Sequence, residues 1–188
     1  MTDKNVSIMN IGSMGYLPQV FKKIENEKKL NIVYLGGSIT MGCNATKTEL
    51  RYVDRSAKWW QTNFPDAEIS YFNAGIGATT SQFGVARVQE HVLDKQPDLV
   101  FVEFSVNDSS SPLFMETYES LVRRLLKAES VKAVVLINNL FYDTGTNAQG
   151  IHNAIGLHYD LPIVSVRNYI FPEIQLGNVC LADYTADM

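Results

Sequence analysis

Apolar and polar positions along the chain predict helices and strands in alternation. Leu17, Val20, Phe21 and Ile24 recur with the i, i+3, i+4, i+7 spacing of an amphipathic helix. Further helical patterns follow over residues 54–64, 81–96, 115–129 and 147–159. Short apolar runs typical of buried strands lie between the helices, over residues 31–35, 68–73, 98–104, 132–138 and 161–166. This alternation predicts a doubly wound α/β domain with three layers and a parallel sheet of about five strands.

Composition and charge argue against several partners. The 188 residues are 46% hydrophobic and 19% charged, which is ordinary for a globular chain with a sizeable core. A net charge of −4 offers no basic surface for nucleic acid or for a membrane, so neither is an expected partner. The first residues lack a basic stretch followed by an apolar segment, which favours a cytoplasmic location. Cys43 and Cys180 form no C-x-x-C motif, so two reduced thiols are expected rather than a disulfide or a metal site.

Three loops with chemically useful residues each follow a predicted strand. They read "GGSIT" at 36–40, "NAGIGATTS" at 73–81 and "SVND" at 105–108. Because the carboxyl ends of parallel strands meet at one edge of the sheet, we expect the three loops to lie together. They supply a hydroxyl, a glycine-rich run of backbone N–H groups and a side-chain amide. Acyl transfer needs this set: a nucleophile, and donors for the oxygen that becomes negative in the tetrahedral intermediate.

Each motif has a simpler interpretation on its own. A serine at the end of a strand is more often a turn or capping residue than a nucleophile. Thr40 stands where a G-x-S-x-G nucleophile elbow has its last glycine. The "GIGATT" segment resembles part of a dinucleotide-binding loop but lacks the third glycine and the later acidic residue. The combination of the three loops, each after its own strand, favours catalysis over these alternatives.

The same residues resemble the SGNH, or GDSL-type, hydrolases, which are serine esterases on a flavodoxin-like three-layer α/β/α sandwich. The first motif of this family is similar to "YLGGSIT", with Gly37 in place of an aspartate, as in a carbohydrate-esterase branch. By this resemblance Ser38 is the nucleophile, and its backbone N–H is one oxyanion donor. The G-x-N-D motif of the family is similar to "SVND", in which Asn107 donates its side-chain amide and Ser105 replaces the glycine.

The second motif of the family is similar to "NAGIGATTS". Its glycine, which gives a backbone N–H to the oxyanion, falls on Ala78 without a gap and on Gly77 with a shift of one residue. The resemblance therefore leaves both residues open as the donor.

The fourth motif of the family, D-x-x-H, supplies a histidine as general base and an aspartate that orients it. Asp187 followed by Met188 is similar to its first half, with the histidine due beyond Met188. The resemblance implies a domain incomplete at its C-terminus, without the helix that follows this motif, and nearly inactive as given. His91, His152 and His158 fall within predicted helices, away from the carboxyl edge, so we expect surface or half-buried structural histidines.

The resemblance covers roughly residues 30–188 and implies two parts. Residues 1–29 form an N-terminal extension with a helix packed on the domain, and residues 30–188 form the SGNH hydrolase domain. The "GGSIT" form implies a serine esterase that removes acetyl groups from hemicellulose-derived carbohydrates such as mannan or xylan. No metal or organic cofactor is implied, and an additional C-terminal domain is expected in the full-length protein.

The substrate pocket is expected around side chains beside the nucleophile and past the fourth strand, namely Ile39, Met41, Phe141 and Tyr142. Two alternatives remain open. A lysophospholipase or thioesterase of the same family needs an elongated apolar groove, and a non-catalytic binding module needs no base at all.

Overall fold

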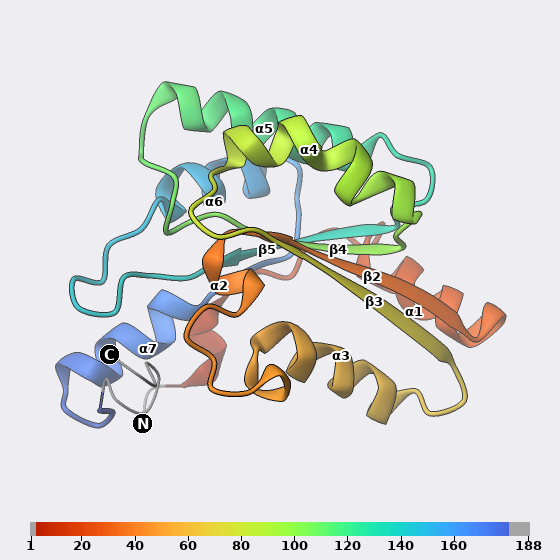
Figure 1. Ribbon diagram of the computed structural model, residues 1–188, viewed down its shortest axis with the longest axis horizontal. Helices are drawn as coiled ribbons and strands as arrows, with labels where there is room; N and C mark the ends of the chain where they lie inside the picture. The colour runs from red at the N-terminus through yellow and green to blue at the C-terminus, as the bar shows by residue number, and fades with distance from the viewer. Residues whose placement is uncertain (1–2, 181–188) are drawn as a thin grey trace.

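A six-stranded sheet forms the middle layer of the domain (Figure 1). The computed structural model describes residues 3–180. The sheet has the strand order β1-β6-β5-β4-β2-β3. Its strands are β1 (Ile8–Asn10), β2 (Lys29–Gly36), β3 (Glu68–Gly75), β4 (Leu99–Glu103), β5 (Ala133–Asn138) and β6 (Ile163–Ser165). The pairs from β3 to β6 are parallel, which confirms the predicted fold class.

The prediction of five strands is wrong by one, because β1 pairs with β6 in antiparallel fashion. The pairs join Ile8 to Val164 and Asn10 to Ile163. This strand has three residues and is largely exposed, so it carries no alternation of apolar and polar side chains that a sequence pattern can detect. Part of the segment ahead of residue 30 thus contributes backbone to the sheet itself.

Helices cover both faces of the sheet (Figure 1). One side carries α1 (Leu17–Glu27) and α3 (Tyr52–Asn63), and the other carries α4 (Ser81–His91), α5 (Pro112–Leu126) and α6 (Gln149–His158). Two further helices follow strands: α2 (Ser38–Met41) begins one residue after β2, and α7 (Val166–Gln175) begins directly after β6. Three short 3₁₀ turns complete the described chain, at Lys4–Ser7, Thr48–Leu50 and Leu93–Lys95.

Alternate residues of the central strands enter two separate cores. Val33 and Leu35 of β2 pack with α4, α5 and α6, whereas Ile32 and Tyr34 pack with α1 and α3. Successive side chains of a strand point to opposite faces, so burial on both faces explains the unbroken apolar run of β2. The neighbouring residues Trp59 and Trp60 of α3 are split between core and surface, because Trp60 is 5% exposed and Trp59 is 52% exposed.

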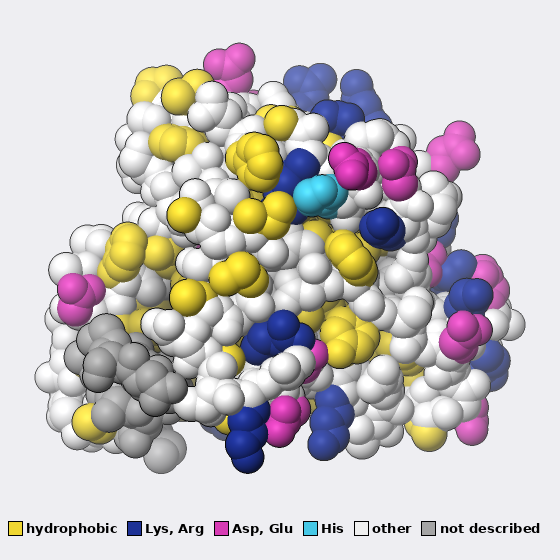
Figure 2. Space-filling view, in the orientation of Figure 1, with side chains coloured by type: hydrophobic (Ala, Val, Ile, Leu, Met, Phe, Trp, Pro, Cys, Tyr) yellow, Lys and Arg dark blue, Asp and Glu magenta, His cyan; other side chains and the backbone are white. Residues whose placement is uncertain are grey.

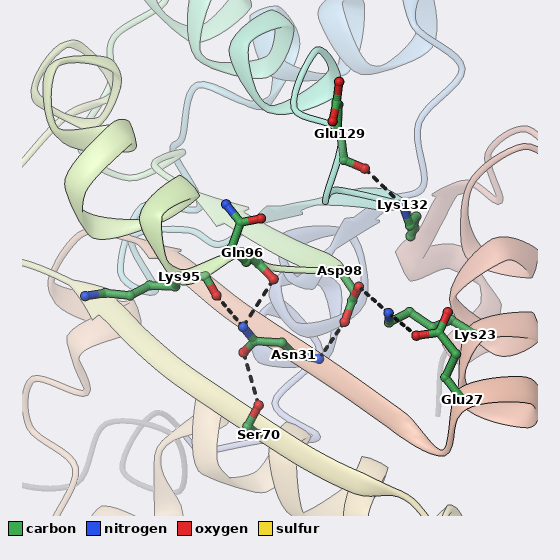
Figure 3. Close-up of polar contacts among 9 residues, drawn as sticks. All are labelled: Lys23, Glu27, Asn31, Ser70, Lys95, Gln96, Asp98, Glu129 and Lys132. Atoms are coloured by element: carbon green, nitrogen blue, oxygen red, sulfur yellow. Dashed lines mark hydrogen bonds and ion pairs between the residues drawn. The ribbon is translucent and has the colours of Figure 1, made fainter.

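A polar network links the amino ends of the strands, at the end of the sheet opposite the three loops (Figure 3). The Asp98 carboxylate accepts from the backbone N–H of Asn31 at 2.9 Å and pairs with Lys23 at 3.3 Å. The Asn31 side chain donates to the carbonyl of Lys95 and accepts from Ser70 at 3.2 Å. These contacts fix β2 against β3 and β4 at the amino ends of the strands, whereas the three loops lie at the carboxyl ends.

Within the described residues, no helix has the length and apolar character needed to cross a membrane.

Candidate active site

Ser38 is the first residue of the short helix α2 and is separated from β2 by Gly37 alone. The chain turns sharply there because Gly36 has no side chain: a Cβ at Gly36 would lie 2.0 Å from Thr40 Oγ1 and 2.6 Å from the carbonyl oxygen of Glu103. The α2 helix ends at Met41 and is capped by Gly42, which adopts φ +93°. Ser38 is half-buried, so its hydroxyl is presented at the carboxyl end of the central strand.

The α2 turn is held from three sides. Thr40, which replaces the last glycine of a nucleophile elbow, is buried, and its Oγ1 lies 2.8 Å from Tyr52 Oη. The carbonyl of Thr40 accepts from the side-chain amide of Asn73 at 2.8 Å. Arg51 donates to the carbonyl of Met41 at 3.4 Å and forms an ion pair with Asp54. These contacts hold the turn that carries Ser38 in a fixed conformation.

The three predicted loops meet around Gly37. A Cβ built on Gly37 would lie 3.1 Å from Asn107 Oδ1 and 3.3 Å from the carbonyl oxygen of Thr79. Gly37 N–H itself donates to the carbonyl of Glu103 at 3.3 Å. A side chain at position 37 would therefore press on both neighbouring loops, which explains why glycine suits this turn.

Ala78 has an unusual backbone conformation, with φ +56°. This left-handed region favours glycine, and a side chain there costs roughly 1–2 kcal/mol. Gly77, by contrast, does not belong to the glycines with positive φ. The Met41 side chain covers Gly77, since a Cβ there would lie 3.4 Å from Met41 Cε. The position that needs glycine-like geometry in this loop is therefore 78.

Asn107 lies in the turn that follows β4. Its backbone N–H donates to the carbonyl of Phe104 at 3.1 Å, as does that of Asp108 at 3.0 Å. The Asn107 side chain is half-buried, whereas Asp108 is buried beneath the turn. Asp108 Oδ1 accepts from the backbone N–H of Ser81 at 2.9 Å, which links this turn to the end of the second loop.

A buried carboxyl group that sequence reasoning missed lies below the site. Glu103 is 1% exposed at the end of β4. Burial raises the pKa of Glu103 to about 7, and hydrogen bonds from Ser105 oppose this shift. Ser105 Oγ lies 3.3 Å from Glu103 Oε1 and 3.1 Å from the carbonyl oxygen of Asn139. Ser105, in place of the family's glycine, thus connects β4 to β5. Only its position two residues before Ser105, the first residue of "SVND", marks Glu103 in the sequence.

The expectation for His152 is wrong. His152 is fully buried, and its Nε2 lies 3.0 Å from Asp108 Oδ2. The α6 helix begins at Gln149, so His152 lies in its first turn, near the carboxyl edge of the sheet rather than away from it. Burial lowers the pKa of His152, and its hydrogen bond with Asp108 opposes this shift only in part.

The other two histidines are surface or half-buried residues, as predicted. His91 Nδ1 lies 3.2 Å from Arg87 Nη1, and His158 is exposed beside Tyr159. Within residues 3–180, no hydrogen bond joins a histidine to Ser38. Asp187 lies outside the described residues, so its role as the orienting aspartate stays a prediction.

Of the side chains expected around the substrate, Met41 lies against the second loop, since a Cβ at Gly77 would lie 3.4 Å from Met41 Cε. Met41 and Phe141 are 41% and 49% exposed, and Ile39 and Tyr142 are half-buried. Figure 2 shows hydrophobic side chains at the surface around α2, with few charged groups among them. Beyond β5, a polar cavity of about 350 Å³ is lined by Thr144, Gly145, Thr146, Asn147, Gln149 and Arg167.

The sheet and the three converging loops define an acylhydrolase-type domain. The chain belongs to the GDSL-like lipase/acylhydrolase family, whose profile matches residues 34–168. No curated protein sequence is similar enough to count as a match.

Among solved structures, a two-domain esterase (CEX) active on acetylated mannans, co-crystallized with mannopentaose, is 45% identical, with a TM-score of 0.96. The alignment covers 100% of this chain and 52% of that esterase, so the chain spans about half the length of that relative. A second structure of a two-domain esterase active on acetylated mannans is 44% identical, with a TM-score of 0.94, over 98% of this chain and 49% of that one. An acetylxylan esterase from Geobacillus stearothermophilus is 19% identical, with a TM-score of 0.67 over 82% of this chain and 83% of that one, and shares the fold.

Proposed function

We propose that this chain is the catalytic domain of a serine esterase that removes acetyl groups from carbohydrates. The observation that carries the proposal is the meeting of three loops around Gly37. Asn107 Oδ1 and the carbonyl of Thr79 both lie beside this residue, directly ahead of Ser38. A hydroxyl flanked by a side-chain amide and a loop of backbone N–H groups suits attack on an ester carbonyl.

In the proposed reaction, Ser38 Oγ attacks the acetyl carbonyl and loses its proton to a general base. The carbonyl oxygen becomes negative and accepts hydrogen bonds from the Ser38 N–H, the second loop and the Asn107 amide. The intermediate collapses to acetyl-serine, and the sugar hydroxyl leaves with the proton from the base. Water then attacks the acetyl-serine and releases acetate. Asp187 and a histidine beyond it are the predicted source of the base.

We assign the second oxyanion donor to the N–H of Ala78 rather than Gly77. The φ of +56° at Ala78 supports this choice, because the family's glycine aligns with position 78 without a gap. A left-handed residue beside a right-handed one turns successive backbone N–H groups toward a common point, which suits donors to an anion.

A carbohydrate substrate is supported by the polar cavity beyond β5. Its lining contains two threonines, two side-chain amides and one arginine, which are suited to sugar hydroxyl groups. The cavity lies at the same edge of the sheet as Ser38, because its lining residues follow β5 and β6, which run parallel to β2. The relatives at 45% and 44% identity act on acetylated mannans, which favours this substrate class over the alternatives.

The test uses the full-length natural protein and acetylated manno-oligosaccharides, with acetate release as the readout. Ser38→Ala should abolish release, whereas Ser110→Ala, at an exposed serine of the turn after Asn107, should leave it unchanged. A Ser38→Ala variant as active as wild type would overturn the proposal. Faster hydrolysis of long-chain p-nitrophenyl esters than of acetate would instead favour a lysophospholipase or thioesterase. Sugar binding without hydrolysis would favour the non-catalytic binding module.

Two further features of the natural protein remain expectations. An additional C-terminal domain is expected because the two-domain esterase is about twice as long as this chain, and the intact mass of the natural gene product tests it. The cytoplasmic location is a prediction that cell fractionation tests.

A further inference from the structure

The buried Asp108 carboxylate joins three parts of the molecule. It follows Asn107 in the turn after β4, and its side chain is 0% exposed. Oδ1 accepts from the backbone N–H of Ser81 at 2.9 Å, and Oδ2 accepts from His152 Nε2 at 3.0 Å. Each carboxylate oxygen therefore has one donor from a different helix, α4 or α6.

The contact with Ser81 fixes the end of the second loop. Ser81 is the first residue of α4, and its Oγ lies 3.0 Å from Thr117 Oγ1 of α5. The short stretch before it contains Ala78 and Thr79, and Thr79 Oγ1 donates to the carbonyl of Ile76 at 2.7 Å. A carboxylate at a helix N-terminus is stabilised by the free N–H groups and the helix dipole. Asp108 thus holds the two loops that carry the predicted oxyanion donors at a fixed separation.

His152 has the properties of a rigid donor to this carboxylate. Its ring stacks on Tyr118, with centroids 3.6 Å apart and an angle of 6° between the planes. Its Nδ1 has no hydrogen-bond partner among the described residues, which fits a neutral ring protonated at Nε2. Being fully buried, this imidazole has no access to substrate, so a role as the general base does not fit.

Resting on the proposed esterase function, we propose that Asp108 and His152 are positioning residues of the oxyanion hole. Asp108 ties the Asn107 turn to the Ala78 loop, and His152 fixes the orientation of the Asp108 carboxylate. Neither residue contacts substrate. Both act by keeping the Asn107 amide and the backbone N–H of the second loop aimed at one point, which matters because misplacement by about 1 Å can cost about 100-fold in rate.

The test removes the N–H group that His152 donates to Asp108 while it keeps an aromatic ring at position 152. His152→Phe retains an aromatic side chain against Tyr118 but cannot donate to Asp108, whereas His152→Gln places an amide N–H close to the position of Nε2. In the full-length protein we expect kcat to fall at least tenfold in His152→Phe with KM within twofold. The kcat of His152→Gln should be within threefold of the wild-type value. His158→Phe, at an exposed position of the same helix, is the matched control and should be unchanged.

A double-mutant cycle separates positioning from a general loss of structure. If His152 acts through Asn107, His152→Phe should cost at least threefold less in an Asn107→Ala background than in wild type. Equal costs in the two backgrounds, or wild-type kcat in His152→Phe, would overturn the proposal.

A readout without activity keeps this test independent of the esterase proposal. In the ¹⁵N-labelled protein, the signals of the Asn107 side-chain amide and of the Ser81 N–H should shift in His152→Phe and stay in place in His158→Phe. Unchanged signals would overturn the positioning role even if the protein hydrolyses esters. Shifted signals in a protein without esterase activity would instead contradict only the proposed function.

Discussion

Arg87 Nη2 lies 3.0 Å from the carbonyl oxygen of Gly36, the residue that ends β2 just ahead of the Ser38 turn. The same guanidinium donates to the carbonyl of Ala74, near the end of β3, at 2.7 Å. Arg87 is 6% exposed, and the ion pairs of the described residues do not include it. A buried cation therefore clamps the strand that carries the nucleophile to the strand that carries the second loop.

Removal of this clamp should destabilise the domain. In Arg87→Met the buried carbonyl of Ala74 loses the donor that Arg87 supplies, whereas the Gly36 carbonyl keeps the N–H of Ile76 at 3.1 Å. We expect a loss of roughly 2 kcal/mol in the free energy of unfolding, measured with urea. Arg124→Met is the control, because Arg124 donates to the carbonyl of Val85 from an exposed position. Equal stability of the two variants would contradict the clamp.

Ala78→Gly should stabilise the protein, since glycine adopts a φ of +56° without steric cost. The expected gain is roughly 0.5–1 kcal/mol after the greater entropy of glycine in the unfolded chain is counted. Ala86→Gly, at an exposed position inside α4, should show the opposite sign and lose about 1 kcal/mol. Urea unfolding of the two variants decides this, and a less stable Ala78→Gly protein would refute the left-handed geometry.

Glu103 should make stability depend on pH. Its pKa is about 7 in the folded protein, above the ordinary 4.5, so the folded state binds more protons than the unfolded state between these two pH values. Stability from this group is therefore complete below about pH 4.5 and is lost as pH rises through about 7. The loss is on the order of 3 kcal/mol at most. Glu103→Gln removes this titration, so the stability of wild type relative to this variant should fall between pH 5 and pH 8. Parallel pH profiles would show that Glu103 is ionised throughout.

Asn107→Ala tests the oxyanion hole itself. Loss of one such donor should lower kcat on the order of 100-fold with little change in KM, because the amide acts on the transition state rather than on substrate binding. Steady-state kinetics of the full-length protein on p-nitrophenyl acetate measure both constants. A variant with wild-type kcat would remove Asn107 from the mechanism.

Much of the fold follows from the sequence because its main strands are buried on both faces. The apolar run at 98–104 predicts β4, and the helical spacing around Val20 and Ile24 predicts α1, whose residues enter the core. The edge strand β1 was not predicted from the sequence, because its pairing with β6 uses backbone groups and needs no pattern of side chains. Helix α7 was likewise not predicted, and Pro172 inside it disguises its period.

The three loops of the site were predictable because parallel strands bring their carboxyl ends to one edge. The buried polar residues below them were not. His152 contacts Asp108, which lies 44 residues away on another element, and no local pattern reports such pairing. Glu103 contacts the nearby Ser105, but a glutamate at the end of an apolar run gives no signal that its carboxyl is buried. The conformation of Ala78 was hidden for a related reason, because alanine gives no sequence signal for a positive φ.

The central claim is that Ser38 is a nucleophile, and covalent labelling tests it most directly. The full-length natural protein is treated with a fluorophosphonate probe, and the modified peptide is mapped by mass spectrometry. We predict one adduct, on Ser38, that is absent in Ser38→Ala and retained in Ser110→Ala. An unlabelled Ser38 in a protein that releases acetate, or an adduct on another residue, would contradict this account.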